Sequence, residues 1–329
     1  MSEALAERAL SLHRRALVAD THADSIMAVV GGERRLIERS DKGHIDFPRL
    51  AEGGIDLQVL ACFIEAEYKP ERALAQALRM IDAIHREVEA SGGQVVLALS
   101  AGDAERAAEQ GKQAVMISLE GGEPIGLDLA VLRSLYRLGV RLVGLTWNQR
   151  NAIADGVGEL RSRGGLTTFG VELVKEMNRL GMLVDVSHLS EAGFWDVLEV
   201  SSQPVIASHS NARALCDHPR NLTDEQIKAL AKNGGVIGMN FFRGFVDRQA
   251  ERATLERVLD HIDHIANLVG PIHVGLGADF DGADPVVGLE DVTRVPAITA
   301  GLLQRGYKDE DVLAILGGNH LRLMRQVIG

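Results

Sequence analysis

Residues able to bind a metal or carry a proton recur along the chain, each just after a short apolar run. They are His22, Asp24, Glu120, His188, His209 and Asp279. Imidazole and carboxylate together are the ligands that a borderline divalent metal such as zinc prefers. On a strand, the two-residue period would put His22 and Asp24 on one face, whereas on a helix they would point apart. The pattern predicts a divalent metal site.

Each of these residues also has an ordinary structural explanation when taken alone. His188 and His209 could be capping or core groups, Glu120 could be a turn carboxylate, and Asp279 with Asp281 could cap a helix or form an Asx-turn. Five other histidines fall in helical segments at no shared position and are interpreted as surface or packing residues: His13, His85, His261, His264 and His320. The shared position of the six candidates, after five separate apolar runs, favours one common site.

The elements that would position these residues alternate between strands and helices. Eight apolar runs lead into polar loops, at 16–20, 55–64, 114–119, 142–146, 183–187, 205–208, 236–240 and 273–279. Helices are expected over 71–90, 128–138, 167–181, 191–200, 224–232, 251–269 and 308–327. A further apolar run at 95–99 is left unplaced.

Strands that alternate with helices imply a parallel sheet, and eight such units fit an α/β chain folded as a (β/α)8 TIM barrel. A doubly wound open sheet is the alternative, but no GxGxxG opens the first helix. In a barrel the carboxyl ends of all strands meet at one rim, so distant residues would converge there. No linker divides the sequence, and residues 1–329 are predicted to form a single catalytic domain.

The composition excludes several classes of partner. The net charge of −11 argues against nucleic acid or an anionic membrane surface. Cys62 and Cys216 lack CxxC spacing and are expected to be buried thiols. The first twenty residues read as an amphipathic helix rather than a signal peptide, and no apolar run approaches the roughly 18 residues of a membrane span. A cytoplasmic location is expected.

Several motifs, in this order, resemble a known family. They are His22-Ala23-Asp24, Gly43 to Leu50, Glu120-Gly121-Gly122, Asp185-Val186-Ser187-His188, Ser208-His209-Ser210, Arg220-Asn221, Gly277 to Gly282 and Gly317-Gly318-Asn319. Together they resemble the membrane (renal) dipeptidase family of zinc metallopeptidases, which has an amidohydrolase-type barrel. The resemblance covers nearly the whole chain and implies a bacterial-type soluble member, a metal-dependent hydrolase.

The resemblance also implies the metal ligands. By motif, His22 and Asp24 would hold a first Zn²⁺, His188 and His209 a second, and Glu120 would bridge both. Each ion would then have three protein ligands, which leaves open coordination positions as catalytic zinc requires. The expected nucleophile is a hydroxide that bridges two metals about 3.5–4 Å apart.

The substrate residues follow from the same resemblance. Asp279 matches the catalytic acid/base, and Arg220 matches the arginine that binds the C-terminal carboxylate of a dipeptide. The expected substrates are L,L dipeptides, extended in several members to a D-residue at the C-terminal position. Where the animal enzymes have Thr-His, this chain has Thr146-Trp147. Trp147 is therefore predicted to be a wall of the substrate pocket, with a packing role as the alternative.

Two other functions stay open on the sequence. One is a related metal-dependent amidohydrolase that acts on another amide, a lactam or an N-acyl amino acid. The other is a catalytically silent barrel that binds metal or assembles with a partner, although the intact set of polar residues argues against it. A homodimer is a further expectation, because relatives are often dimers.

Overall fold

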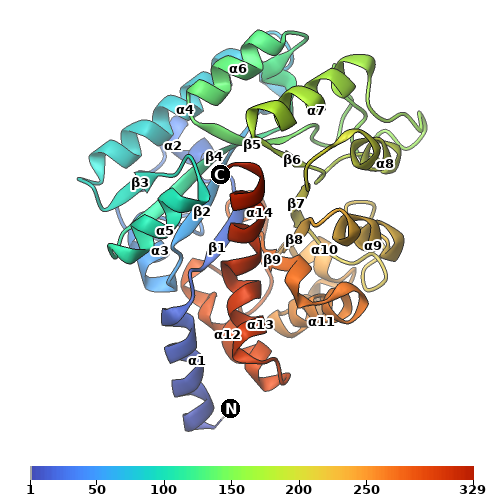
Figure 1. Ribbon diagram of the computed structural model, residues 1–329. Coiled ribbons are helices and arrows are strands. Elements are labelled where there is room, and N and C mark those ends of the chain that lie inside the picture. Colours follow the sequence, from blue (N-terminus) through green and yellow to red (C-terminus); the bar gives the residue numbers. More distant parts are fainter. Residues whose placement is uncertain (1) are drawn as a thin grey trace.

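The computed structural model describes residues 2–329 and has a closed ring of eight parallel strands at its centre (Figure 1). The ring contains β1 (Ala19–Ala23), β2 (Leu57–Phe63), β4 (Gln113–Glu120), β5 (Val140–Gly144), β6 (Leu183–Asp185), β7 (Ile206–Ser210), β8 (Val236–Met239) and β9 (Val274–Leu276). Each strand pairs with its neighbours in parallel, and β1 closes the ring by pairing with both β2 and β9. The predicted TIM barrel is confirmed.

The unplaced apolar run forms a short additional strand, β3 (Val95–Leu97). β3 pairs with the first half of β4, from Gln113 to Val115, whereas β5 pairs with the second half, from Ile117 to Glu120. The extra strand therefore lies beside the amino end of β4 and leaves its carboxyl end in the ring. This arrangement keeps the end of β4 available to the rim of the barrel.

The first strand lies three residues later than the apolar run that predicted it, and this shift places His22 within the strand. Two polar residues of β1, Asp20 and Thr21, are buried and form hydrogen bonds with neighbouring strand ends. Thr21 Oγ1 donates to the carbonyls of Ser208 and Leu276, and Asp20 Oδ1 accepts from the Ala278 amide at 2.8 Å. Hydrophobicity alone does not predict the full length of this strand, because hydrogen-bonded polar side chains are buried within it.

Helices surround the ring and cover its outer face (Figure 1). Those that follow strands in the predicted positions are α4 (Ala73–Ala90), α6 (Leu129–Arg137), α7 (Thr168–Leu180), α8 (Glu191–Val200), α9 (Asp224–Lys232) and α11 (Leu255–Val269). The others are α1 (Glu3–Arg15), α2 (Ile26–Val30), α3 (Phe47–Gly53), α5 (Ala101–Glu109), α10 (Arg243–Val246), α12 (Pro296–Gln304), α13 (Asp309–Leu313) and α14 (Asn319–Val327). Thr167, Ser190 and Thr223 cap α7, α8 and α9 through their side-chain oxygens.

Two predicted helices are shorter or less regular than expected. The helix predicted over 251–269 begins only at Leu255, whose amide is bonded to the Val287 carbonyl. The helix predicted over 308–327 is interrupted by a π-helical turn, Ala314–Gly318. A Cβ on Gly317 would lie 2.0 Å from the Leu17 carbonyl oxygen, so glycine allows this turn to approach the segment before β1.

The hydrophobic core occupies the space between the strands and the helices, and a second apolar cluster joins the amino ends of several strands to α5 and α14. Cys62 and Cys216 are free and buried, as expected. Within residues 2–329, no helix combines the length and the apolar character needed to cross a membrane. The opposite end of the barrel, where the strands finish, carries the polar residues described next.

Candidate metal centre and active site

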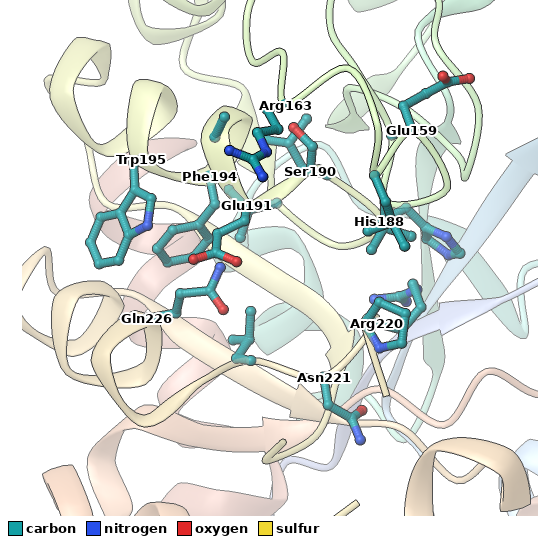
Figure 2. A pocket seen from close by; sticks show the side chains of 18 of the residues that line it. Glu159, Arg163, His188, Ser190, Glu191, Phe194, Trp195, Arg220, Asn221 and Gln226 are labelled. Carbon is teal, nitrogen blue, oxygen red and sulfur yellow. The ribbon is translucent and has the colours of Figure 1, made fainter. Parts of the chain in front are cut away.

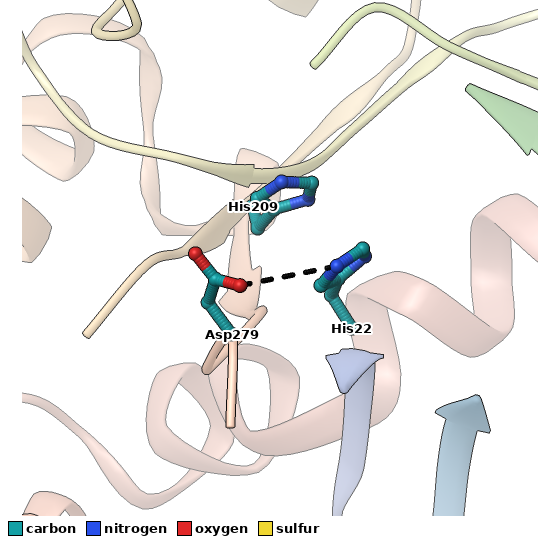
Figure 3. Close-up of side chains that lie close together, drawn as sticks. All are labelled: His22, His209 and Asp279. Carbon is teal, nitrogen blue, oxygen red and sulfur yellow. Dashed lines mark ion pairs between the residues drawn. The ribbon is translucent and has the colours of Figure 1, made fainter. Parts of the chain in front are cut away.

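The six predicted metal and proton-transfer residues converge at the carboxyl ends of the strands. His22 lies in β1 and Asp24 directly after it, Glu120 is the last residue of β4, and His209 lies in β7. His188 and Asp279 each stand three residues beyond their strands, β6 and β9. Residues far apart in the sequence therefore share one rim, and Figure 3 shows His22, His209 and Asp279 turned toward a common centre.

Glu120 stands between two groups of possible ligands. Its Oε2 lies 3.5 Å from His22 Nε2, which in turn lies 3.3 Å from Asp24 Oδ2. Its Oε1 lies 3.0 Å from His188 Nε2 and 3.8 Å from His209 Nε2. In both groups, Glu120 with His22 and Asp24, and Glu120 with His188 and His209, the ligand atoms lie within 4.8 Å of one another. This geometry suits one carboxylate shared by two ions.

Two of the histidines are oriented by hydrogen bonds on their other ring nitrogen. His209 Nδ1 lies 2.7 Å from Ser208 Oγ, which lies 2.5 Å from Asp185 Oδ2, and His188 Nδ1 lies 2.8 Å from Asn148 Oδ1. If each Nδ1–H donates along these contacts, both Nε2 atoms present a lone pair to the centre. Such partners fix the tautomer and raise the basicity of a metal-binding imidazole.

The charges of the centre fit a bound divalent cation. His22 Nε2 and Asp24 Oδ1 are buried without a hydrogen-bond partner among the described residues. Burial and the neighbouring Glu120 charge raise the pKa of Asp24 well above its usual range. Burial lowers the pKa of His188 to about 3, so neutral imidazole is favoured there. A neutral imidazole beside crowded carboxylates is a donor set that a metal ion satisfies.

Asp279 is held at the edge of the same centre in a strained conformation. Its φ of 63° lies in the left-handed region, and its Oδ2 accepts from Asn240 Nδ2 at 2.8 Å. Oδ1 lies 3.9 Å from His22 Nε2. A Cβ on Gly282 would lie 2.0 Å from Asp24 Oδ2 and 2.6 Å from Asp279 Oδ1, so glycine is needed beside both carboxylates. Strain of this kind is characteristic of functional positions.

Arg220 lies beside the backbone of His209 and is almost fully buried. One Nη atom donates to the His209 carbonyl at 2.9 Å and the other contacts Ser210 Oγ at 3.3 Å. Its Nε has no partner among residues 2–329. Burial lowers the pKa of Arg220 to about 10, which keeps the guanidinium charged at neutral pH. The structure therefore holds an incompletely paired cation beside the cluster.

Trp147 lines a pocket of about 370 Å³ over the cluster, together with Phe63, Phe242 and Phe245. The Trp147 and Phe63 rings meet edge to face with centroids 5.1 Å apart. Lys69 Nζ lies 5.4 and 5.6 Å from the Phe63 and Trp147 ring centroids and forms an ion pair with Glu123 at 3.0 Å. This cation–π contact connects Trp147 to a half-buried ion pair outside the lining of the pocket.

Sequence reasoning missed the residues that support the ligands. Asn240 directly follows β8, Asn148 stands four residues beyond β5, and Ser208 lies within β7 next to His209. All three are near the position that identified the ligands, so a similar criterion could have found them. Lys69 and Glu123 carry no such signal, because their pairing depends on how two loops meet. The pocket walls Phe242 and Phe245 belong to the short α10 region and were likewise not predicted.

Comparison with known proteins places this geometry in a family. The family model for membrane dipeptidases (peptidase family M19) matches residues 6–328. Dipeptidase tcpJ of Claviceps purpurea is 38% identical over 296 residues, which cover 87% of this chain and 69% of that protein. Dipeptidase verJ of Clonostachys rogersoniana is 40% identical over 266 residues, which cover 80% and 67% respectively.

A solved structure agrees along almost the full length. The metallopeptidase from Rhodobacter sphaeroides, crystallised with a phosphinate mimic of the dipeptide L-Ala-D-Ala, superposes with a TM-score of 0.89 at 30% identity. The match covers 95% of this chain and 99% of that one. The chain therefore belongs to the membrane dipeptidase family, peptidase family M19, and is a metallo-dipeptidase.

Proposed function

We propose that this dipeptidase uses two zinc ions and hydrolyses dipeptides that have a free C-terminal carboxylate. His22 and Asp24 would hold one ion, His188 and His209 the other, and Glu120 both. The observation that carries this proposal is the position of Glu120, whose two oxygens face the two ligand groups separately. When bound, the ions supply Lewis-acid polarisation of the scissile carbonyl and a water-derived nucleophile at neutral pH.

Asp279 acts as the proton carrier of the reaction. Its carboxylate lies at the edge of the cluster, where it can take a proton from the attacking water and deliver it to the leaving amine. Asn240 holds Oδ2 by a hydrogen bond, which leaves Oδ1 directed toward the reacting centre. The role rests on this placement beside His22 and His209, since the ligand atoms of the three residues lie within 4.8 Å of one another.

Arg220 binds the C-terminal carboxylate of the substrate. A planar guanidinium suits a carboxylate better than a lysine ammonium, and the buried charge of Arg220 is only partly used by protein groups. This requirement restricts the enzyme to short peptides with a free C-terminus. Trp147 forms a wall of the pocket over the reacting bond and, with Phe63, excludes water from it.

The stereochemical range is proposed to include both L,L and L,D dipeptides. The support comes from the neighbour that was crystallised with a mimic of L-Ala-D-Ala, since its fold is shared over 95% of this chain. We also propose that residues 1–329 act as one catalytic domain, because ligands from β1 to β9 complete a single cluster. A lactam, an N-acyl amino acid or another amide stays the alternative substrate.

The variant Asp279→Asn tests the mechanism, because it keeps size and hydrogen bonding but removes the proton carrier. We expect unchanged metal content and a decrease in kcat of about 100-fold or more. Arg220→Met should raise KM for free dipeptides and leave their C-terminal amides no worse as substrates. Full activity of Asp279→Asn, or equal rates for free and amidated dipeptides in the wild type, would contradict the proposal.

A further inference from the structure

A second cavity, of about 470 Å³, lies beside the metal centre and has no role in the proposal above. It lies between α8, the loop of residues 156–164 and the loop that carries Arg220 (Figure 2). Its size is within the range of about 300–1,000 Å³ that is usual for small-molecule sites. The cavity is larger than the pocket of about 370 Å³ over the cluster.

Two residues of the catalytic centre, His188 and Arg220, also line this cavity. His188 and Arg220 form one side of it, and Figure 2 shows them adjacent on that side. His188 also lines the pocket over the cluster, so it stands between the two spaces. A substrate whose C-terminal carboxylate contacts Arg220 would therefore have its C-terminal side chain next to this cavity.

The walls of the cavity are mainly apolar. Val186, Leu189, Phe194 and Leu222 are buried there and form its inner surface. At the outer edge Leu160 and Trp195 are 69% and 40% exposed, which is unusual for large apolar side chains at one place. Burial of apolar ligand surface against such walls is favourable.

The charged residues of the cavity balance once a carboxylate occupies Arg220. Arg163 and Arg213 contribute two positive charges, and Glu159 and Glu191 contribute two negative charges. The Arg213 guanidinium also donates hydrogen bonds to the carbonyls of Pro219 and Asn221, both at 2.9 Å. The charges of the lining residues then sum to zero, so the cavity has no net charge that would favour a charged side chain over a neutral one.

We infer that this cavity is the subsite for the C-terminal side chain of the substrate and selects large, uncharged apolar residues such as leucine and phenylalanine. The inference rests on the proposed function, because it uses the contact between Arg220 and the substrate carboxylate. It goes beyond that function by naming the class of dipeptide that the enzyme prefers.

The test compares L-Ala-Xaa dipeptides with Gly, Leu, Phe or Glu at the C-terminal position, chiral residues in both configurations, on the zinc-loaded enzyme. In the preferred configuration we expect kcat/KM for Leu and Phe to exceed that for Gly by about 10- to 100-fold, as burial of such a side chain predicts. Ala192→Phe, which puts an aromatic ring into the cavity, should erase this advantage while kcat/KM for L-Ala-Gly stays within about threefold.

Two further variants keep the test decisive. Glu199→Phe adds the same ring to an exposed position of α8 that does not line the cavity, and should leave the preference intact. Leu160→Glu changes an exposed residue at the outer edge, so folding is preserved, and should lower kcat/KM for Leu and Phe selectively.

The outcomes separate this inference from the proposed function. Hydrolysis of L-Ala-Gly without any preference for Leu or Phe, or an unchanged preference in Ala192→Phe, would overturn the subsite and leave the proposed function standing. A preference for Glu over Leu would also overturn it. Absence of dipeptide hydrolysis by the zinc-loaded wild type would overturn both.

Discussion

Removal of the Ser208 hydroxyl should weaken the second metal position selectively. Ser208 Oγ is fully buried and connects His209 Nδ1, at 2.7 Å, to Asp185 Oδ2, at 2.5 Å. In Ser208→Ala both groups lose this partner, and His209 is no longer held in the tautomer that presents Nε2. Loss of such a supporting contact typically lowers metal affinity by about 10- to 100-fold.

The same substitution should also cost stability, and the two effects can be separated. An unsatisfied buried polar group costs about 1–3 kcal/mol, and Asp185 Oδ1 keeps its bonds to the amides of Ser187 and Ser208. Ser118→Ala is the matched control, because Ser118 is a buried serine of β4 whose hydroxyl contacts only the Leu60 carbonyl. It should lose about 0.5–1.5 kcal/mol and no metal affinity.

The assay is a zinc titration in competition with a chromophoric chelator, run beside urea unfolding of the wild type and both variants. We expect two binding steps, of which Ser208→Ala weakens one by about 10- to 100-fold, with activity restored by excess zinc. Equal zinc affinity in Ser208→Ala and Ser118→Ala would refute the reasoning, since the serine would then have only a packing role.

Two further predictions follow from residues outside the cluster. In a Trp195→Phe background, Lys69→Met should shift the fluorescence of Trp147 and raise KM by about 2- to 5-fold with little change in kcat. Lys69→Arg should retain the wild-type fluorescence and KM. Unchanged emission in Lys69→Met would contradict the contact between Lys69 and Trp147. Burial lowers the pKa of His320 from 6.5 to about 4, so the unfolded chain takes up this proton first and stability falls as the pH decreases through this range. In urea unfolding, the wild type should lose about 2 kcal/mol more stability than His320→Gln between pH 7.5 and 5. Equal pH slopes of the two proteins would contradict this prediction.

The sequence was sufficient for the fold and for the convergence of the ligands, because both depend on regular features. Alternating runs predicted the barrel, and the topology of a barrel brings His22, Glu120 and Asp279 to one rim whatever their separation. The same rule applies to Asn148 and Asn240, whose supporting roles became visible only when their hydrogen bonds were seen.

Features that depend on contacts between loops could not be predicted from the sequence. The Lys69–Glu123 pair and the walls of the large cavity join segments whose relative placement no local pattern specifies. The break in the last helix is similar, because the need for Gly317 arises from the Leu17 carbonyl, three hundred positions earlier in the chain. Periodicity predicts that a helix exists, and tertiary packing decides where its geometry changes.

The central claim, a two-ion centre shared by Glu120, is tested most directly by anomalous diffraction at the zinc edge from crystals of the zinc-loaded enzyme. We predict two peaks, one bound by His22 and Asp24 and the other by His188 and His209, with Glu120 in contact with both. A single peak in a fully active enzyme, or zinc bound without Glu120, would contradict the account.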